Sequence, residues 1–211
     1  INHKRVQRIM HDLKLFGKRP KEKYHSYKGE VGKVAGNIIQ RNFKADRPLQ
    51  KWTTDVTQFH FSWGKCYLSP ILDMNTNEII SYDLSMIPNL NQIKRMLNRA
   101  FKKFRNLQGL IMHSDQGWQY QHEYYRSELK KHGIIQSMSR KGNCYDNSIM
   151  ETFFGRMKNE MYYGSEKEYT SFKVFAKAVK EYIHYFNKER IQKKTKWMPP
   201  EIYRETSTNA I

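Results

Sequence analysis

Three acidic residues lie at positions where a carboxylate calls for a structural or chemical explanation. Asp55 lies inside a run rich in Thr, Val and Phe that predicts a strand, an element from which Asp is depleted. Asp115 directly follows a short apolar run, and Glu151 opens a segment with helical periodicity. If the strands that carry Asp55 and Asp115 are neighbours, their carboxylates meet at one end of a sheet. Carboxylates bind Mg²⁺, and two such ions about 3.5–4 Å apart promote in-line attack on a phosphodiester. The three residues are therefore candidate metal ligands for cutting or joining nucleic acid.

Each of the three carboxylates also has a structural explanation. Asp55 fits a solvent-facing strand position, and Asp115 fits an Asx turn before Gly117. Ser148 and Glu151 together match the S-x-x-E capping box of a helix start. The residues alone leave both explanations open.

The elements that must position these side chains follow from periodicity. Residues 90–105 carry a helical apolar face, and residues 110–113 form a short apolar run typical of a buried parallel strand. Pro70 indicates a bulge or an edge position in its strand. The predicted strands are residues 52–61, 66–73, 78–84, 110–113 and 134–138, and the predicted helices are residues 90–105, 119–132, 148–162 and 170–188. Three antiparallel strands followed by two βα crossovers predict an α/β fold with one mixed five-stranded sheet and helices on its faces.

Charge is the dominant feature of the composition. The 211 residues include 38 basic and 20 acidic side chains, a formal net charge of +18, and the excess is concentrated toward both ends. Such an excess favours a polyanionic partner, and no apolar run approaches the roughly 20 residues of a membrane span. Two cysteines, Cys66 and Cys144, are too few for a disulfide framework or a zinc knuckle built on Cys pairs. We therefore expect nucleic acid, and no membrane, as the partner.

Several motifs resemble the integrase-core transposases of bacterial insertion sequences, which are relatives of retroviral integrases. The resemblance covers nearly the whole chain, and 35 residues separate Asp115 from Glu151, which is the spacing of that family. Retroviral integrases also carry a His/His/Cys/Cys zinc domain, which this chain lacks, so the bacterial branch is favoured. The matching segments are WTTDVT at residues 52–57, HSDQG at 113–117, GNCYDNS at 142–148, ETFF at 151–154 and KNE at 158–160.

The resemblance implies a ribonuclease-H-like core and a reaction. Asp55, Asp115 and Glu151 would hold two Mg²⁺ or Mn²⁺ ions and catalyse DNA strand cleavage and strand transfer. The implied partners are double-stranded DNA at transposon ends and target, with a dimer or higher assembly on that DNA. The implied location is the bacterial cytoplasm, in association with the nucleoid. A plain nuclease and a non-catalytic DNA-binding regulator on the same fold are the alternatives.

The same resemblance divides the chain. Residues 1–20 match the end of a truncated helix-turn-helix domain, although a solvated basic helix explains residues 3–16 as well. Residues 21–50 are expected to be a basic linker, residues 51–190 the integrase catalytic core, and residues 191–211 a C-terminal tail. Because Glu151 follows a Gly-containing loop, we expect its side chain to be displaced when no metal is bound.

Supporting residues lie around Glu151. Lys158 lies two helical turns after it, where the family has a basic residue that contacts DNA. Asp146 is expected to cap the Glu151 helix, while Asn147 fits either a cap or the site. His113 is expected to be a structural partner at a strand end, with a catalytic role as the alternative. Trp118 fits base stacking or core packing equally well. The predicted DNA-binding residues, each also explained as a solvated charge, are Lys158, Arg156, Arg140 and Lys141.

Overall fold

A computed structural model describes residues 2–16 and 32–208. The strands are β1 (Lys51–Thr54), β2 (Thr57–Phe61), β3 (Gly64–Asp73), β4 (Ile79–Ser85), β5 (Ile111–Ser114) and β6 (Ile135–Met138). The α-helices are α1 (His3–Asp12), α2 (Leu90–Lys103), α3 (Trp118–Gln121), α4 (Glu123–Lys131), α5 (Ser148–Met161), α6 (Phe172–Lys188) and α7 (Pro200–Thr208). Two short 3₁₀ helices, η1 (Cys144–Asn147) and η2 (Lys193–Thr195), precede α5 and α7. None of the helices described is long and apolar enough to cross a membrane.

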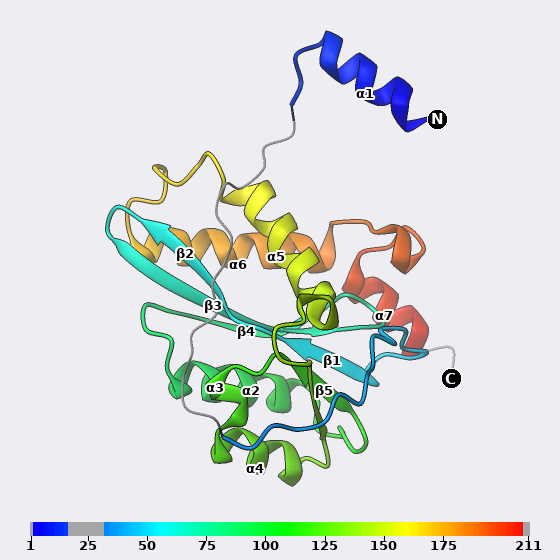
Figure 1. Cartoon of the computed structure of the whole chain (residues 1–211), viewed down its shortest axis with the longest axis vertical. Helices are drawn as coiled ribbons and strands as arrows, with labels where there is room; N and C mark the ends of the chain where they lie inside the picture. Colours follow the sequence, from blue (N-terminus) through cyan, green and yellow to red (C-terminus); the bar gives the residue numbers. More distant parts are fainter. Residues whose placement is uncertain (1, 17–31, 209–211) are drawn as a thin grey trace.

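The strands form one mixed sheet in the order β2-β3-β1-β5-β6, with β4 on the other side of β3 (Figure 1). β1 pairs antiparallel with β3 and parallel with β5, and β5 pairs parallel with β6. This confirms the predicted mixed sheet of three antiparallel strands followed by two parallel ones. Helices α2 and α3–α4 make the two crossovers that parallel pairing requires.

The predicted strand 52–61 is divided into two strands at Asp55 and Val56. β1 and β2 both pair with β3, and one register runs through both of them, from Trp52 opposite Asp73 to Phe61 opposite Gly64. The same register places Asp55 opposite Pro70, which has no N–H for the ladder. Pro70 therefore lies in a central strand rather than an edge strand, and a register shift follows it between Ile71 and Leu72. The interruption frees the backbone around Asp55 from regular pairing.

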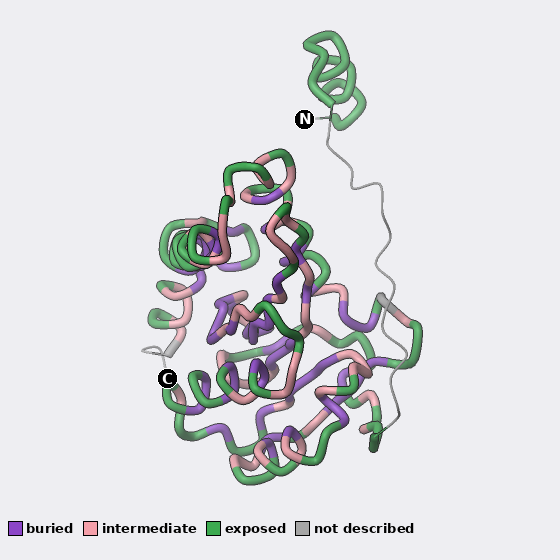
Figure 2. The backbone as a smooth tube through the Cα atoms, turned by 90° about the vertical axis from the view of Figure 1, so that its left-hand side faces the viewer, coloured by how far each residue is buried: buried purple, intermediate pink, exposed green. Residues whose placement is uncertain are grey.

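Two hydrophobic clusters fill the two faces of the sheet. Figure 1 shows α2, α3 and α4 on one side and α5 and α6 on the other, and Figure 2 shows buried residues concentrated along the sheet between them. The first cluster lies under α2 and α4 and includes Trp52, Ile93, Met96, Met112 and Leu129. The second lies under α5 and α6 and includes Phe59, Leu68, Phe153, Phe175 and Phe186. Packing on both faces holds the central strands rigidly, and these strands carry the candidate site.

Helix boundaries differ from prediction in two places. The predicted helix 119–132 is two helices, because His122 is extended and its ring accepts a hydrogen bond from the Tyr124 amide (3.1 Å), which caps α4. Residues 191–211, expected as a tail, contain α7, which begins at Pro200 and packs against α6. Arg204 of α7 pairs with the buried Glu78 at 2.6 Å. By contrast, no residue of α1 is buried (Figure 2).

Candidate active site

Asp55 and Asp115 lie level with each other on neighbouring parallel strands. The β1–β5 register pairs Thr53 with His113, and two residues further along the same register reach Asp55 and Asp115. Since side chains alternate between the faces of a strand, Asp55 shares a face with Thr53, and Asp115 shares it with His113. Sheet topology thus brings the two predicted carboxylates together.

Burial and mutual repulsion disfavour ionisation of the Asp55–Asp115 pair. Removal of the Asp55 carboxyl from water raises its pKa well above the usual value, and the neighbouring charge of Asp115 raises it further. Burial also raises the pKa of Asp115. The compensating hydrogen bonds are few: Asp55 Oδ1 accepts from the Val56 amide at 2.7 Å, and Asp115 Oδ1 accepts from the Gly117 amide at 2.9 Å. The Asx bond predicted as an alternative for Asp115 is present and occupies only one of its oxygens.

Asn147 orients Asp55. Its Nδ2 donates to Asp55 Oδ2 at 3.0 Å, while its Oδ1 accepts from Thr53 Oγ1 at 3.1 Å. Asn147 stands at the N-cap position of α5, yet its side chain makes no capping hydrogen bond. Of the two roles that the sequence left open, the structure therefore places Asn147 in the site.

Glu151 lies in the first turn of α5 with its side chain exposed. The capping box is not formed, because Ser148 is the first helical residue and no side chain caps the helix. The charge of Glu151 contributes to the raised pKa of Asp55, after burial and the charge of Asp115. Within residues 2–16 and 32–208, however, no three His, Cys, Asp or Glu side chains are gathered closely enough to hold a metal ion. Asp55 and Asp115 are together, and Glu151 stands back from them.

Lys158 supplies the nearest positive charge on α5. Its Nζ lies 5.2 Å from the centre of the Phe59 ring, and its charge lowers the pKa of Asp55. Burial lowers the pKa of Lys158, while Asp55 opposes that shift. Lys158 is therefore directed toward the carboxylates, as its position two turns after Glu151 predicts.

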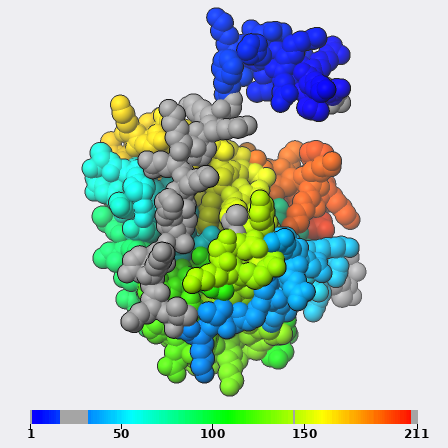
Figure 3. Space-filling model, in the orientation of Figure 1, coloured from blue at the N-terminus to red at the C-terminus, as the bar shows by residue number. Residues whose placement is uncertain are grey.

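Asp146, expected to cap α5, is instead held in a network of its own. Its buried carboxylate accepts from Arg140 Nε (2.9 Å), Arg41 Nε (2.8 Å) and Asn37 Nδ2 (3.0 Å). These bonds hold its pKa far below the usual value, with Arg140 the largest cause. The segment carrying Asn37 and Arg41 lies against the loop before α5 (Figure 3). Arg140, a predicted DNA contact, already has a carboxylate partner.

His113 is a structural partner of the same loop. Its Nε2 lies 2.9 Å from the Asp146 carbonyl oxygen, which accepts only, so Nε2 carries the proton. Its Nδ1 lies 2.9 Å from Ser137 Oγ and accepts from that hydroxyl. Burial lowers the pKa of His113, which favours this neutral form.

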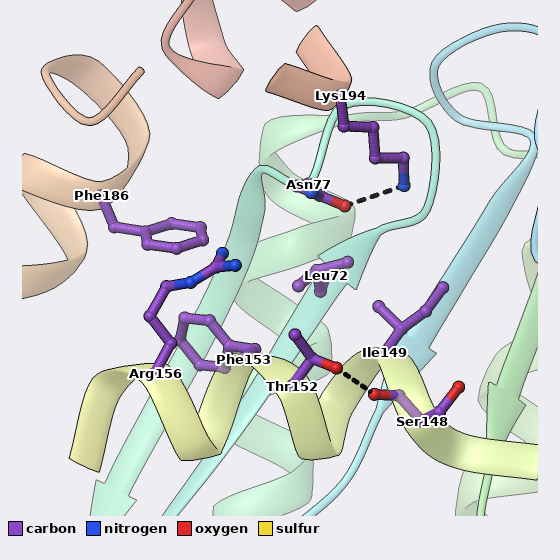
Figure 4. Close-up of a pocket in the computed structure, with 9 residues that line it drawn as sticks. All are labelled: Leu72, Asn77, Ser148, Ile149, Thr152, Phe153, Arg156, Phe186 and Lys194. Atoms are coloured by element: carbon purple, nitrogen blue, oxygen red, sulfur yellow. Dashed lines mark hydrogen bonds between the residues drawn. The ribbon is translucent and has the colours of Figure 1, made fainter. Parts of the chain in front are cut away.

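The remaining predicted residues form no hydrogen bond or ion pair with the three carboxylates in the part of the chain that the structure describes. Arg156 points into a cavity on another flank of α5 (Figure 4). Lys141 is exposed in the loop before η1, and Trp118 begins α3 with about a third of its surface exposed. These positions do not decide between DNA contact and a solvated charge for Lys141, or between base stacking and core packing for Trp118.

Sequence reasoning missed the residues that support Asp55 and Asp146 from a distance. Thr53 carried a usable signal, because alternation places it on the face of Asp55. Arg41 and Asn37 carried none, since nothing in a polar, basic segment indicates a contact with a residue more than a hundred positions away.

The oxygens of this site suit a hard divalent cation. Asp115 Oδ2 and the Glu151 carboxylate have no hydrogen-bond donor among the residues that the structure describes. Burial raises the pKa of both aspartates, and the charge of Asp115 raises that of Asp55 further; a bound cation would favour their ionised forms. The carboxylate oxygens of Asp55, Asp115 and Glu151 are the hard donors that Mg²⁺ and Mn²⁺ prefer.

Comparison with known proteins gives a consistent result. Family models described as "Integrase core domain" match residues 45–144 and 151–207. An uncharacterized transposase-like protein of Haemophilus influenzae is 54% identical over 209 residues, which span 99% of this chain and 95% of that protein. The putative transposase InsK of insertion sequence element IS150 from Escherichia coli is 50% identical over 204 residues, spanning 97% of this chain and 71% of InsK.

Solved structures share the fold at low sequence identity. The HTLV-2 integrase catalytic core in complex with magnesium superposes with a TM-score of 0.60 at 14% identity, covering 76% of this chain and 99% of that one. The BIV integrase catalytic core gives a TM-score of 0.52 at 19% identity, covering 76% and 97%. The fold is thus that of the retroviral integrase cores, which are ribonuclease-H-like. The identity to the bacterial relatives goes further, and the chain belongs to the insertion-sequence transposases with an integrase core domain.

Proposed function

We propose that this transposase cuts and joins DNA strands by in-line attack on phosphodiesters, using divalent cations held by Asp55, Asp115 and Glu151. Its family supports the coarser statement that the chain acts in DNA transposition as a DNA-cutting and DNA-joining enzyme. The two-ion mechanism and the three residue roles are the proposal. The observation that carries it is the Asp55–Asp115 pair, placed level on adjacent strands with raised pKa values.

The cations, when bound, would make an attacking oxygen nucleophilic at neutral pH and stabilise the charge on the leaving oxygen. Asp55 and Asp115 hold them from the sheet, with Asp55 fixed in orientation by Asn147. Glu151 completes the ligand set from α5, which requires its exposed side chain to turn toward the two aspartates. Lys158 lies on the same helix and contacts a DNA phosphate near the cut.

The reaction has two steps in this proposal. Water attacks a phosphodiester at the transposon end, which releases a strand with a 3′-hydroxyl. That hydroxyl then attacks a second phosphodiester, so one P–O bond forms as another breaks. No side chain becomes covalently attached to DNA, so Tyr120, which is buried near the carboxylates, is not a nucleophile.

Double-stranded DNA, at the transposon end and the target, is the proposed partner. The formal charge of +18 and the exposed Lys141 are complementary to phosphates. The HTLV-2 integrase core has been solved in dimeric and trimeric forms. We propose that this chain likewise assembles as a dimer or larger on DNA, because two ends must be brought together.

A joining assay tests the proposal. A labelled donor duplex with a recessed 3′-hydroxyl at its end is incubated with a target plasmid and Mg²⁺, and products are resolved by size. We expect labelled target DNA that depends on Mg²⁺ or Mn²⁺ and disappears with chelator. Hydrolysed fragments without joined product would indicate a plain nuclease, and DNA binding without either product would indicate a regulator.

A further inference from the structure

A second polar site lies on the flank of α5 that faces away from Asp55. A cavity of about 200 Å³ opens there between α5, the end of β3, α6 and the segment of η2 (Figure 4). Its lining residues are Leu72, Asn77, Ser148, Ile149, Thr152, Phe153, Arg156, Phe186 and Lys194. The lining includes two cations and no Asp or Glu, so the cavity attracts anions.

Lys194 is held ready at one side of the cavity. Its Nζ donates to the carbonyl oxygen of Met74 (2.5 Å) and to Asn77 Oδ1 (2.9 Å), which leaves one of its three N–H groups for a ligand. Burial lowers the pKa of Lys194, and the charge of the buried Asp73 opposes that shift. The Asp73 carboxylate already accepts from several donors in its own turn. Lys194 therefore faces the cavity as a positioned donor.

Arg156 stands at the other side without a partner. It forms no hydrogen bond or ion pair with any residue that the structure describes, and Figure 4 shows its guanidinium directed over the apolar floor. The acidic residue one turn later, Glu160, is engaged by Arg190 (2.6 Å) and by the Tyr182 hydroxyl (2.8 Å). Nothing in the described chain therefore neutralises Arg156.

The apolar floor and the hydroxyl at the rim of the cavity fit the sugar and base of a nucleotide, beside the two cations that suit its phosphate. Leu72, Phe153 and Phe186 form an apolar floor, against which a sugar or a base edge packs. Thr152 adds a hydroxyl at the rim, where its Oγ1 donates to the Ser148 carbonyl (2.8 Å) and keeps its lone pairs for a donor or a bridging water. An anionic group joined to an apolar group fits this arrangement better than a free inorganic anion.

The cavity is placed to meet the strand that enters the active site. Ser148, Thr152 and Arg156 recur at every fourth residue along one flank of α5, whereas Glu151 and Lys158 lie along another. A helix is about 10–12 Å across with its side chains, so a strand that crosses α5 reaches both flanks within a few nucleotides.

We propose that this cavity is a second DNA-backbone site, in which Arg156 and Lys194 bind a phosphate a few nucleotides from the one that is cut. The proposal rests on the proposed function for the identity of the polymer. It assigns a role to Lys194, which the C-terminal segment brings to α5, and it separates the role of Arg156 from that of Lys158. The site holds the strand and takes no part in bond breaking.

Charge-removing variants test the proposal first. Arg156→Gln and Lys194→Gln are combined and compared with a matched pair on the outer face of α6, Lys177→Gln with Lys180→Gln. Duplex binding is measured without metal, in the Asp55→Asn background, between 50 and 200 mM salt. Each lost phosphate contact lowers the slope of log Kd against log salt by about 0.9, which is about a three-fold change over that range. We expect a loss of about one phosphate contact for the cavity pair and a clearly smaller loss for the α6 pair.

An uncharged analogue of the phosphodiester shows which phosphate of the strand contacts the cavity. Methylphosphonate is placed at one position at a time along the strand, and affinity is measured for the parent and for the cavity variant. We expect one or two positions where methylphosphonate weakens the parent several-fold and leaves the cavity variant unchanged. Equal effects of the cavity and α6 pairs, or the absence of any such position, would overturn the proposal. Unchanged DNA binding with altered self-association in sedimentation would also overturn it, in favour of a second copy as the occupant.

These measurements stand apart from the chemistry. Binding in the Asp55→Asn background requires no catalysis. The methylphosphonate effect can therefore still depend on the cavity residues even if strand joining is never observed. Arg156→Lys is the conservative variant, and its salt slope should stay close to that of the parent because the charge is kept.

Discussion

The Asp146 carboxylate and the Asp55–Asp115 pair lie on either side of Asn147, at the N-terminus of α5, and their surroundings differ in kind. Asp146 is enclosed by Arg140, Arg41 and Asn37, which hold its pKa far below the usual range. Asp55 faces Asp115, and its pKa is raised well above the usual range. The peptide bond between Asp146 and Asn147 joins the two groups, because Asn147 bonds Asp55.

The difference separates a structural carboxylate from a candidate catalytic one. Asp146 has its counterions within the chain, so its charge is satisfied and fixes the loop before α5. Asp55 and Asp115 have one lysine nearby and must receive positive charge from outside. Strong pKa perturbation alone would mark both groups, and only the sign and cause of each shift tell them apart.

The largest expected contrast is in activity. Asp55→Asn keeps the side-chain shape but removes a metal-ligating charge, so Mg²⁺-dependent joining should fall by on the order of 10³-fold or more. Asp146→Asn should keep most of its joining activity at a temperature where it is folded. Both are measured in the donor–target assay at equal folded concentration, verified by circular dichroism. Comparable losses in the two variants would mean that the comparison of the two groups is wrong.

The unfolding free energies should show the reverse order, with the larger loss in Asp146→Asn than in Asp55→Asn. Asp146→Asn loses charge-assisted hydrogen bonds inside a buried network, and we expect a loss of about 2 kcal/mol in unfolding free energy, moderated because both arginines are half-exposed. Because the folded-state pKa of Asp146 is lowered, its contribution is complete above about pH 4 and declines as the pH falls further. Urea unfolding at several pH values should give a shallower acid limb for Asp146→Asn than for the parent. Asp46→Asn, at an exposed position, serves as the control and should leave that limb unchanged.

The residue that joins the two groups should affect metal affinity. Asn147→Ala removes the bond that orients Asp55, and outer partners of metal ligands typically contribute about 10-fold or more in affinity. We expect the Mg²⁺ concentration for half-maximal joining to rise by about 10-fold, with a smaller change at saturating Mg²⁺. Asn159→Ala, on the exposed face of α5, is the matched control. An unchanged Mg²⁺ requirement with reduced stability would make Asn147 a purely structural residue.

The sequence predicted the part of this comparison that rests on periodicity. Strand alternation and the short apolar run before Asp115 are local signals that predicted two strands carrying Asp55 and Asp115, and the structure shows that these strands are neighbours. Glu151 depended on family spacing, because a capping box explains the same residues until the N-cap geometry is known. The mixed sheet followed from the order of elements.

The residues that contact the carboxylates could not be predicted from local sequence patterns. Arg41 reaches Asp146 across 105 residues, and Asn147 reaches Asp55 across 92, so both contacts depend on how the finished fold brings loops together. The assignment of Asp146 as a helix cap failed for this reason: a carboxylate just before a helix start has the same local sequence whether it bonds the helix or two distant arginines. Helix α7 was missed because its apolar face is short and follows two prolines.

The smallest expected effect tests the charge deficit directly. In the folded state without metal, the pKa of Asp115 is raised, so the folded protein binds a proton that the unfolded chain releases as the pH rises above about 4. Ionisation of the pair therefore costs stability at neutral pH, and Asp115→Asn should raise the metal-free unfolding free energy at pH 7. Asn keeps an oxygen for the Gly117 amide, so the turn is preserved. Thermal unfolding with chelator and with Mg²⁺ measures both parts: Mg²⁺ should stabilise the parent and leave Asp115→Asn nearly unchanged. A destabilised variant, or equal stabilisation of both proteins by Mg²⁺, would show that Asp115 has enough positive charge from the chain itself and resembles Asp146 rather than Asp55.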